Sequence, residues 1–372
     1  MLITGAVLEE VGRPGPYAET RPITVCDLEL DRPGPREVLV RIEVAGLCHS
    51  DLSVVDGNRP RPTPMLLGHE AAGIVEETGR AVDDLRPGQR VIMTFLPRCG
   101  ECRACRTDGL VPCAAGSAAN NAGEMMDGGS RLRRGDQVVH HHLGVSGFAT
   151  HAVVDHRSVV PVDDDVPADV AAVMGCAVLT GGGALINVGR PRAGDTVAVV
   201  GLGGVGMAAL LTALGEPDID VVAVDPVRTK RERALVLGAS RALTPDEAIE
   251  TGLAADVVIE AAGSTRAFET AVACTGPGGR MVTVGLPAPD ARASVSPLAL
   301  VAQGRSLIGS YLGSAVPSRD IPLFVNRWRQ GRLPAQQLIS SRITLDGVNL
   351  AMDELAAGNA VRQLVVLDEG SR

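Results

Sequence analysis

Short runs of Val and Ile separated by Pro and Gly dominate the chain from about residue 25 to residue 94. Segments such as VLVRIEVAG, AAGIVEETG and QRVIMTF alternate apolar and polar positions, which is the period of half-buried strands. This region therefore predicts an antiparallel sheet or barrel. Residues 98 to about 147 are rich in Cys, Gly, Arg and Asn and show no period, and we interpret them as loops held together by something other than a hydrophobic core.

The pattern changes from about residue 195 onward. Apolar runs typical of strands (VAVVG, VVAVD, DVVIEAAG, RMVTVGL) alternate with helix-like segments (VGMAALLTALG, TKRERALVLGA). This alternation predicts parallel strands joined by helical crossovers, in a doubly wound sheet. The uncharged residues 196–215 have the length of a membrane span, but their central glycines fit a strand, a turn and a helix better. After residue 311 the pattern blurs, with an amphipathic stretch (IPLFVNRWRQG) before a closing strand (VRQLVVLD).

Composition narrows the class of protein. A chain of 372 residues exceeds the size at which one hydrophobic core keeps growing, so we expect two domains. The net charge of -9 argues against a nucleic-acid partner. The start, MLITGAVLEEVGRPG, has no basic segment and no long apolar run, so we expect a cytoplasmic protein without a membrane partner. There the eight cysteines would stay reduced, and clustered ones are better interpreted as metal ligands.

Four cysteines are clustered in the segment CGECRACRTDGLVPC. Cys99, Cys102, Cys105 and Cys113 are separated by two, two and seven residues. Two-residue gaps let thiolates converge on one tetrahedral ion, and four thiolates fill the coordination sphere of Zn²⁺, leaving no position for a substrate. The alternative is a redox pair, but such cysteines come in twos and open a helix. We therefore predict a structural zinc site in a lobe of about residues 98–114.

A second group of metal-binding residue types lies in AGLCHSDL and LLGHEAAG, which carry Cys48, His49, Asp51, His69 and Glu70. Taken alone, a Cys or His beside glycine fits packing or a turn as well as a ligand. A third soft ligand, Cys176 in AAVMGCAVLTGGGA, precedes the α/β region. Two thiolates and one imidazole leave the fourth corner of a zinc tetrahedron open for water or substrate, as in catalytic sites.

The motif GLGGVG follows the run VAVV and opens an apolar helix, and Asp225 ends the next strand. In this context the motif predicts a dinucleotide-binding loop, whose glycines allow a tight turn, close approach of the pyrophosphate and packing of helix on strand. The expected contacts in the loop are Gly201, Gly203, Gly204, Val205 and Gly206. Asp225 would bond the ribose hydroxyls and repel a 2′-phosphate, which favours NAD over NADP. Arg228 and Lys230 leave NADP as the alternative; otherwise they begin a solvated helix.

Together these residues resemble the medium-chain, zinc-containing alcohol dehydrogenases, in particular the long, two-zinc branch of the liver and plant enzymes. The resemblance covers essentially the whole chain. It implies hydride transfer between a primary alcohol, aromatic or of medium chain length, and NAD, with two zinc ions per chain and a homodimer. It implies an α/β fold: a GroES-like, mostly antiparallel catalytic domain over residues 1–177, a Rossmann domain with a doubly wound parallel sheet over 178–311, and a return to the catalytic domain over 312–372.

The resemblance also assigns roles to residues near the reaction zinc. The implied ligands are Cys48, His69 and Cys176. Asp51 would orient His69 and raise its basicity, and Glu70 would lie behind the metal. Ser50 would hydrogen-bond the alcohol. These assignments place the chemistry in the first half of the chain.

Further residues are implied in binding cofactor and substrate. The cofactor contacts outside the glycine loop are His49, Thr180, Lys230 and Arg362. The residues at the substrate channel are Phe95, His142, Leu143, Leu286 and Tyr311. Ordinary core packing is the alternative for the channel residues, because pocket walls and core look alike in sequence.

Two positions depart from the liver-type pattern. The proton relay of those enzymes ends in a histidine where this chain has Ser53, whose hydroxyl passes a proton only with the help of water. In the run of His140, His141 and His142, the last replaces an aromatic pocket residue. His142 either faces the substrate, as a polar contact or a substitute base, or is a structural histidine; we favour the structural role.

Two other functions compete with alcohol oxidation. Arg59 and Arg61 would suit an enzyme that oxidises S-hydroxymethyl conjugates of glutathione or mycothiol, but the segment AAGS after Cys113 lacks the arginine that such relatives carry there. A non-catalytic, cofactor-binding member of the superfamily is disfavoured because such proteins lack the zinc ligands. The expected partner is therefore a small alcohol or aldehyde.

Overall fold

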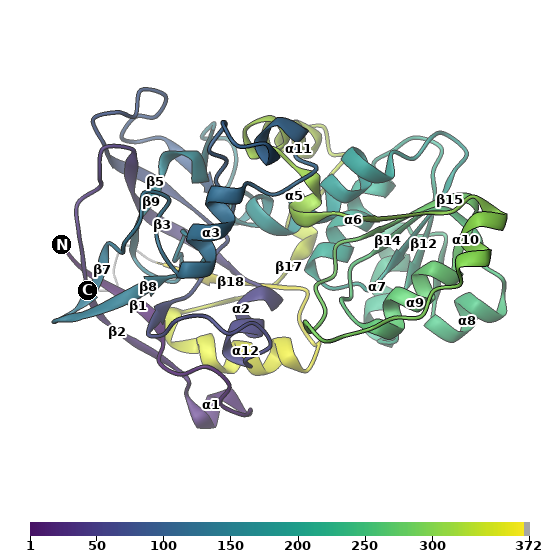
Figure 1. Cartoon of the computed structure of the whole chain (residues 1–372), viewed down its shortest axis with the longest axis horizontal. Coiled ribbons are helices and arrows are strands. Elements are labelled where there is room, and N and C mark those ends of the chain that lie inside the picture. Colours follow the sequence, from purple (N-terminus) through teal and green to yellow (C-terminus); the bar gives the residue numbers. More distant parts are fainter. Residues whose placement is uncertain (368–372) are drawn as a thin grey trace. The chain divides into compact units, whose positions relative to one another are not determined.

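The computed structural model describes residues 1–367 and divides the chain into two compact units (Figure 1). The first unit comprises Met1–Cys176 together with the chain from Ile339 onward, and the second comprises Ala177–Leu338. The metal-ligand types predicted from the sequence all fall in the first unit, and the glycine-rich loop falls in the second.

The chain returns to the first unit at Ile339, later than the expected boundary at residue 312. The intervening segment packs on the helix that opens the second unit. A Cβ atom on Gly313 would lie 2.1 Å from the carbonyl oxygen of Leu179, and one on Gly182 would lie 2.7 Å from Phe324. These close approaches, which only glycine permits, keep residues 312–338 with the second unit.

The first unit contains a closed barrel with the strand order β1-β2-β7-β8-β4. The strands are β1 (Leu2–Leu8), β2 (Ile23–Leu30), β4 (Met65–Leu66), β7 (Leu132–Arg134) and β8 (Gln137–His141). Neighbouring strands are antiparallel except for β4 and β8. Buried aliphatic side chains, including Val7, Leu28, Leu66 and Val139, form one hydrophobic cluster on these strands.

A larger sheet in the same unit has the order β10-β6-β5-β3-β18-β17, with β9 also pairing with β3. Its strands are β3 (Glu37–Leu47), β5 (Ala71–Thr78), β6 (Arg90–Met93), β9 (His151–Asp155), β10 (Val159–Val162), β17 (Ile339–Ile343) and β18 (Arg362–Val366). The α-helices of this unit are α1 (Tyr17–Thr20), α2 (His49–Val55), α3 (Ala114–Ala122), α4 (Ala168–Val173) and α12 (Val348–Ala356). The antiparallel sheet or barrel predicted for about residues 25 to 94 is confirmed, because β3, β5 and β6 pair in antiparallel order.

The interpretation of residues 98 to 147 as loops is wrong in part. Helix α3 begins directly after Cys113, and strands β7 and β8 close the barrel within the same stretch. Helix α3 consists of small residues, and β7 has only three residues, two of them Arg. Neither has enough apolar positions to show a period in the sequence.

The second unit is a six-stranded parallel sheet with the order β13-β12-β11-β14-β15-β16. Its strands are β11 (Thr196–Val200), β12 (Asp220–Val224), β13 (Arg241–Leu243), β14 (Ala255–Glu260), β15 (Thr275–Thr283) and β16 (Ser306–Gly309). Its α-helices are α5 (Leu179–Gly183), α6 (Gly204–Leu214), α7 (Arg228–Leu237), α8 (Pro245–Glu250), α9 (Thr265–Ala273), α10 (Pro297–Gln303) and α11 (Pro317–Arg329). In order of sequence the strands run 3-2-1-4-5-6, the Rossmann arrangement, so the doubly wound prediction is confirmed.

A continuous apolar helical stretch, Ala168–Gly189, is long enough to cross a membrane, but 89% of its most apolar window is buried inside the protein. It is therefore a core helix. Residues 196–215 form strand β11 and helix α6, as their glycines indicated.

Candidate functional site

Three soft ligands from distant parts of the chain meet in the first unit. Cys48 precedes helix α2, His69 follows strand β4, and Cys176 follows helix α4. Their ligand atoms lie within 4.8 Å of one another, and Cys176 Sγ lies 3.5 Å from His69 Nε2. Tetrahedral zinc, with bonds of about 2.3 Å to sulfur and about 2.05 Å to nitrogen, places such a pair about 3.6 Å apart. The three residues therefore fit a zinc ion whose fourth corner is left to another ligand.

Cys176 reaches this site through an irregular helical segment. It lies in a π-helical turn, Met174–Val178, a feature that is frequent at functional sites. The preceding Gly175 packs so tightly that a Cβ atom there would lie 2.2 Å from the carbonyl oxygen of Met93. This close approach to strand β6 holds the turn against the sheet and fixes Cys176.

Asp51 joins the local structure of helix α2 to the metal ligands. Its Oδ2 accepts a hydrogen bond from the Cys48 backbone N–H at 2.9 Å, which caps the helix. Its Oδ1 lies 3.0 Å from His69 Nδ1, in hydrogen-bond contact. Burial would raise the pKa of Asp51, but the charge of His69 and contacts with two imidazoles hold it well below its usual value. The carboxylate is thus ionised and positioned to orient His69, the role expected for it.

Glu70 and Arg362 form a second buried layer beside the ligands. Arg362 Nε lies 3.5 Å from Glu70 Oε1, and Arg362 Nη1 donates to the carbonyl oxygen of Leu47 at 3.1 Å. Gly46 makes room for this layer, because a Cβ atom there would lie 1.9 Å from Glu70 Oε1. A hydrogen bond from Cys176, with the nearby charges of Arg362 and His69, lowers the pKa of Cys48 well below its usual value despite burial. Within this layer, the charge of Arg362 therefore favours the Cys48 thiolate that zinc requires. The hydrogen bond to Cys48 and burial, with the charge of Glu70, raise the pKa of Cys176.

Arg362 is only 2% exposed, and its contacts with Glu70 and the Leu47 carbonyl oxygen place it beside the metal ligands. Its expected contact with the cofactor pyrophosphate stays a prediction. His49, expected to make a similar contact, is exposed at the first position of helix α2. Ser50 follows it and is half-buried.

The expected channel residues divide between the two units. In the first unit the ring of Phe95 packs edge-on against His69, with ring centroids 5.3 Å apart. His142 and its neighbour in sequence, Leu143, are also buried. In the second unit Leu286 and Tyr311 lie at the surface, 47% and 36% exposed.

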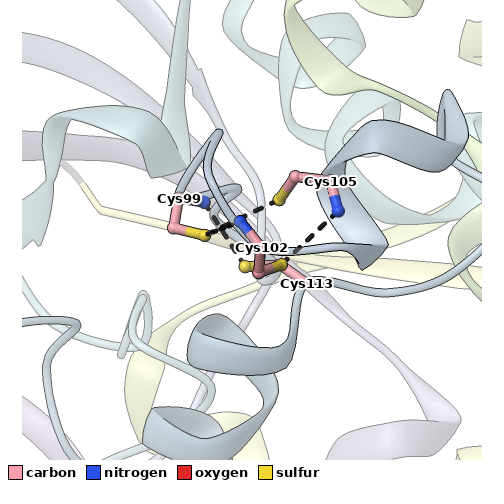
Figure 2. Close-up of side chains that lie close together, drawn as sticks. All are labelled: Cys99, Cys102, Cys105 and Cys113. Carbon is pink, nitrogen blue, oxygen red and sulfur yellow. Dashed lines mark hydrogen bonds between the residues drawn. The ribbon is translucent and has the colours of Figure 1, made fainter.

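The four lobe cysteines converge on one point (Figure 2). Their sulfur atoms all lie within 4.8 Å of one another, and those of Cys99 and Cys105 are 3.8 Å apart. Zinc–sulfur bonds of about 2.3 Å in a tetrahedron give the same separation of about 3.8 Å. Backbone N–H groups donate to three of the sulfurs at 3.3 to 3.4 Å. Bonds of this kind, first from Ala114, lower the pKa of Cys102 to about 6.

The glycine-rich loop joins strand β11 to helix α6 in the second unit. Gly201 has φ 91°, and a Cβ atom on Gly206 would lie 1.7 Å from the Gly201 carbonyl oxygen. At Gly203, by contrast, a Cβ atom would meet nothing within 4 Å. Gly201 thus serves the turn and Gly206 the packing, and Gly203 leaves open space for a ligand to approach the backbone. Gly204 and Val205 begin helix α6.

Asp225 closes the loop at the end of strand β12. Its Oδ2 accepts from Leu202 N at 2.7 Å and its Oδ1 accepts from Val227 N at 2.8 Å. This carboxylate therefore fixes the backbone of the glycine-rich loop. A cavity of about 490 Å³ opens here, lined by Gly201, Asp225, Lys230, Thr244 and Arg266 among others. Arg228 lies outside it and pairs with Glu232 at 2.7 Å on the surface. Thr180 is buried in helix α5.

Sequence reasoning missed the residues that support the metal ligands. Gly46, Gly175 and the buried position of Arg362 depend on which backbone segments meet. The strand pairing of β3 with β18, in which Gln363 faces Leu47, brings Arg362 to the end of β3, directly before Cys48. A glycine inside a predicted strand, as at Gly46 in VLVRIEVAG, was a signal of a close approach of backbone or side chain.

A GroES-like barrel domain with a buried Cys–His–Cys set, joined to a Rossmann sheet with an acidic residue behind its glycine loop, defines a zinc-dependent dehydrogenase of the medium-chain class. Known proteins agree with this class. Residues 34–164 match the alcohol dehydrogenase GroES-like domain family, and residues 200–328 match the zinc-binding dehydrogenase family.

Two curated relatives span nearly the whole chain. Geraniol dehydrogenase from Castellaniella defragrans is 37% identical over 371 residues, covering 97% of this chain and 96% of that protein. NDMA-dependent alcohol dehydrogenase from Amycolatopsis methanolica is 34% identical over 360 residues, covering 94% and 97%. The crystal structure of benzyl alcohol dehydrogenase from Acinetobacter calcoaceticus superposes with a TM-score of 0.90 at 29% identity, covering 99% and 100%.

The chain belongs to the zinc-dependent medium-chain alcohol dehydrogenases. It is an alcohol oxidoreductase that uses zinc and a nicotinamide cofactor, and the non-catalytic alternative is set aside.

Proposed function

We propose that this enzyme transfers hydride between a primary alcohol, aromatic or of medium chain length, and NAD, giving the aldehyde. The observation that carries the proposal is the buried set of Cys48, His69 and Cys176, which supplies three of the four ligands of a tetrahedral zinc. Zinc held there supplies Lewis-acid chemistry that lowers the pKa of a bound alcohol. Asp51 keeps the His69 imidazole in its orientation. The Ser50 hydroxyl accepts the proton that the alcohol loses while it gives up its own hydroxyl proton, which moves on toward solvent.

The proton then leaves by a route different from a relay through residue 53. The Ser53 hydroxyl donates to the His49 carbonyl oxygen at 2.9 Å, so it is committed to the helix backbone. The exposed His49 imidazole, one residue before Ser50, passes the proton to solvent. His49→Gln should lower kcat several-fold, whereas Ser53→Ala should leave kcat unchanged. Equal effects of the two substitutions would reject this route.

NAD is the proposed cofactor because Asp225 lines the cavity beside the glycine loop, where a carboxylate repels a 2′-phosphate. Lys230 in the same cavity is the side chain that would favour NADP. Comparison of kcat/KM with the two cofactors should show at least a 10-fold preference for NAD. Asp225→Ser should reduce that preference. A wild-type preference for NADP would reject this part of the proposal.

Two zinc ions per chain are proposed, one on each cysteine cluster, as in the long branch of the family. The lobe cluster supports a structural ion because its four sulfurs complete a tetrahedron, and the Cys48 cluster supports a reactive ion because it leaves a corner open. Elemental analysis of the purified protein should give two zinc atoms per chain. A content near one zinc atom per chain that falls to zero when the lobe cysteines are substituted would show that the reaction site holds no metal.

Apolar primary alcohols are the proposed substrates. Phe95 and Leu143 are buried in the first unit, and relatives act on geraniol and benzyl alcohol according to their names. A panel of aromatic, allylic, aliphatic and secondary alcohols should show the highest kcat/KM with primary aromatic or medium-chain alcohols. Formaldehyde oxidation that depends strictly on glutathione or mycothiol would instead support the thiol-adduct alternative, in which Arg59 and Arg61 bind the conjugate.

A homodimer in the cytoplasm is the proposed state of the enzyme, with no nucleic-acid or membrane partner. Strand β16 forms one edge of the parallel sheet. On the preceding helix α10, Leu298 and Val301 are 77% and 83% exposed. An exposed edge strand beside exposed apolar side chains suits pairing with a second copy. Light scattering should give twice the chain mass, and Leu298→Glu with Val301→Glu should give the monomer.

A further inference from the structure

His142 contacts the carboxylate that orients the zinc-binding imidazole. Its Nδ1 lies 3.1 Å from Asp51 Oδ1, the same oxygen that lies 3.0 Å from His69 Nδ1. The rings of His142 and His69 meet edge to face, with centroids 5.3 Å apart. All three side chains are at most 1% exposed. These contacts place His142 at the metal-ligand site, beside the carboxylate that contacts His69.

The backbone fixes His142 in this place. Strands β4 and β8 pair in parallel, with Leu66 opposite His141, so the chain segments leading to His69 and His142 run side by side. The His142 backbone N–H donates to the Leu66 carbonyl oxygen at 3.2 Å and to Ser146 Oγ at 3.0 Å. The turn that follows folds back through Val145 N and Ser146 N, both of which donate to the His142 carbonyl oxygen. His142 is thus held at the barrel strand and does not depend on its own ring contacts.

We propose that His142 is a positioning residue for the reaction zinc, acting through Asp51 on His69. A buried carboxylate oxygen has room for two donors, and a second donor fixes its direction. His142 Nδ1 lies 3.1 Å from Asp51 Oδ1, a hydrogen-bond distance, but the pair does not meet the full geometric criteria of a hydrogen bond, so the contact is one between the carboxylate charge and the imidazole dipole. When His142 as well as His69 contacts Asp51, the carboxylate has a fixed direction, and His69 keeps the ring orientation that its zinc bond needs.

The test compares zinc retention in three variants of His142. His142→Phe fills the space and removes the donor. His142→Asn returns an N–H donor close to the position of Nδ1, because the amide nitrogen and Nδ1 stand at the same distance from the backbone. His142→Gln places its amide one atom farther out. Zinc release to a chromophoric chelator is followed on the zinc-loaded enzyme, and the lobe zinc serves as the reference within each protein.

The proposal rests on the zinc site proposed above, and it expects His142→Phe to release the reaction zinc about 10- to 100-fold faster than wild type, the usual range for partners of metal ligands. His142→Asn should come within about 3-fold of wild type, and release from the lobe should not change. His140→Phe is the matched control. Within the described residues, the neighbouring His140 makes no contact with Asp51. The d–d absorption of the cobalt-substituted reaction site should shift in the Phe variant and not in the control.

Two results would overturn the positioning role. One is equal retention in wild type and His142→Phe; the other is release from His142→Asn as fast as from His142→Phe, which would mean that packing alone matters. If the Phe variant does not fold, Asn retaining zinc longer than Gln supports the role and equal release overturns it. A wild-type protein that carries only the lobe zinc is a different failure, because it rejects the proposed function itself.

Discussion

The four lobe cysteines lie within fifteen residues of chain, whereas Cys48, His69 and Cys176 are drawn from segments up to 128 residues apart. The lobe sulfurs receive hydrogen bonds from the N–H groups of their own loop, and three of the four cysteines are half-exposed. The other three ligands are buried and are held by Asp51 and the sheet. A local cluster depends on its own loop, while a distributed one depends on the whole domain.

This difference separates the consequences of losing each metal. Under the two-zinc proposal, the lobe zinc takes the place of a hydrophobic core, so metal there would contribute to folding. The reaction site lies inside a sheet that already has an aliphatic core, so metal there contributes mainly to chemistry. Substitutions matched between the two clusters should therefore separate stability from turnover.

The largest expected effect is that of Cys176→Ser. It removes one ligand of the reaction zinc in a site that the fold itself maintains, so turnover should fall by about 10³-fold or more while the melting temperature changes little. Zinc content should fall by one atom per chain. Steady-state kinetics, elemental analysis and a thermal melt measure the three quantities. A variant that melts far below wild type would show that the distributed site is also a structural one.

Cys113→Ser is the counterpart in the lobe. Cys113 is buried and also caps helix α3 by accepting from Gly116 N at 3.4 Å. Its loss should release the lobe zinc and lower the free energy of unfolding by about 3 kcal/mol, since metal binding and folding are coupled there. Turnover per folded molecule should stay within about 3-fold of wild type. Urea unfolding and active-site titration test this, and a loss of turnover matching Cys176→Ser would break the comparison.

Much of this contrast could be predicted from the sequence, and the rest could not for a physical reason. The lobe ligands and the glycine loop are local patterns, so spacing alone carries them. His69 and Cys176 were predictable as residue types, but the contact of His142 with Asp51 follows from the pairing of β4 with β8, strands of two and five residues. Strands this short leave no period to read, and the buried position of Arg362 depends on the equally non-local pairing of β3 with β18.

Two glycines offer a smaller test of the same contrast. In Gly46→Ala the new Cβ atom would lie 1.9 Å from Glu70 Oε1, and overpacking of this kind should cost about 2 kcal/mol. In Gly100→Ala, in the lobe, the Cβ atom meets nothing within 4 Å, and only the left-handed backbone at φ 81° opposes it, at about 1 kcal/mol. Gly46→Ala should also speed loss of the reaction zinc, while Gly100→Ala should not. Equal zinc retention in both would show that the Glu70 layer does not support the ligands.

The smallest expected effect is an acid sensitivity confined to the buried barrel region that supports the distributed site. Burial lowers the pKa of His141 from 6.5 to about 3, and its Nε2 accepts from Arg131 N at 3.1 Å. A folded-state pKa below the unfolded one gives stability that is complete above pH 6.5 and is lost as pH falls toward 3. Between pH 8 and pH 5.5 this loss amounts to about 1 kcal/mol.

His141→Gln keeps an acceptor for Arg131 N but cannot be protonated, so the free energy of unfolding should fall less between pH 8 and pH 5.5 than in wild type, by about that amount. Urea unfolding at a series of pH values measures it. Gly100→Ala, which retains His141, should keep the wild-type slope. If both variants keep it, the acid sensitivity arises elsewhere. If Gly100→Ala loses the wild-type dependence of the free energy of unfolding on pH, the half-exposed lobe and not the buried site limits stability in acid.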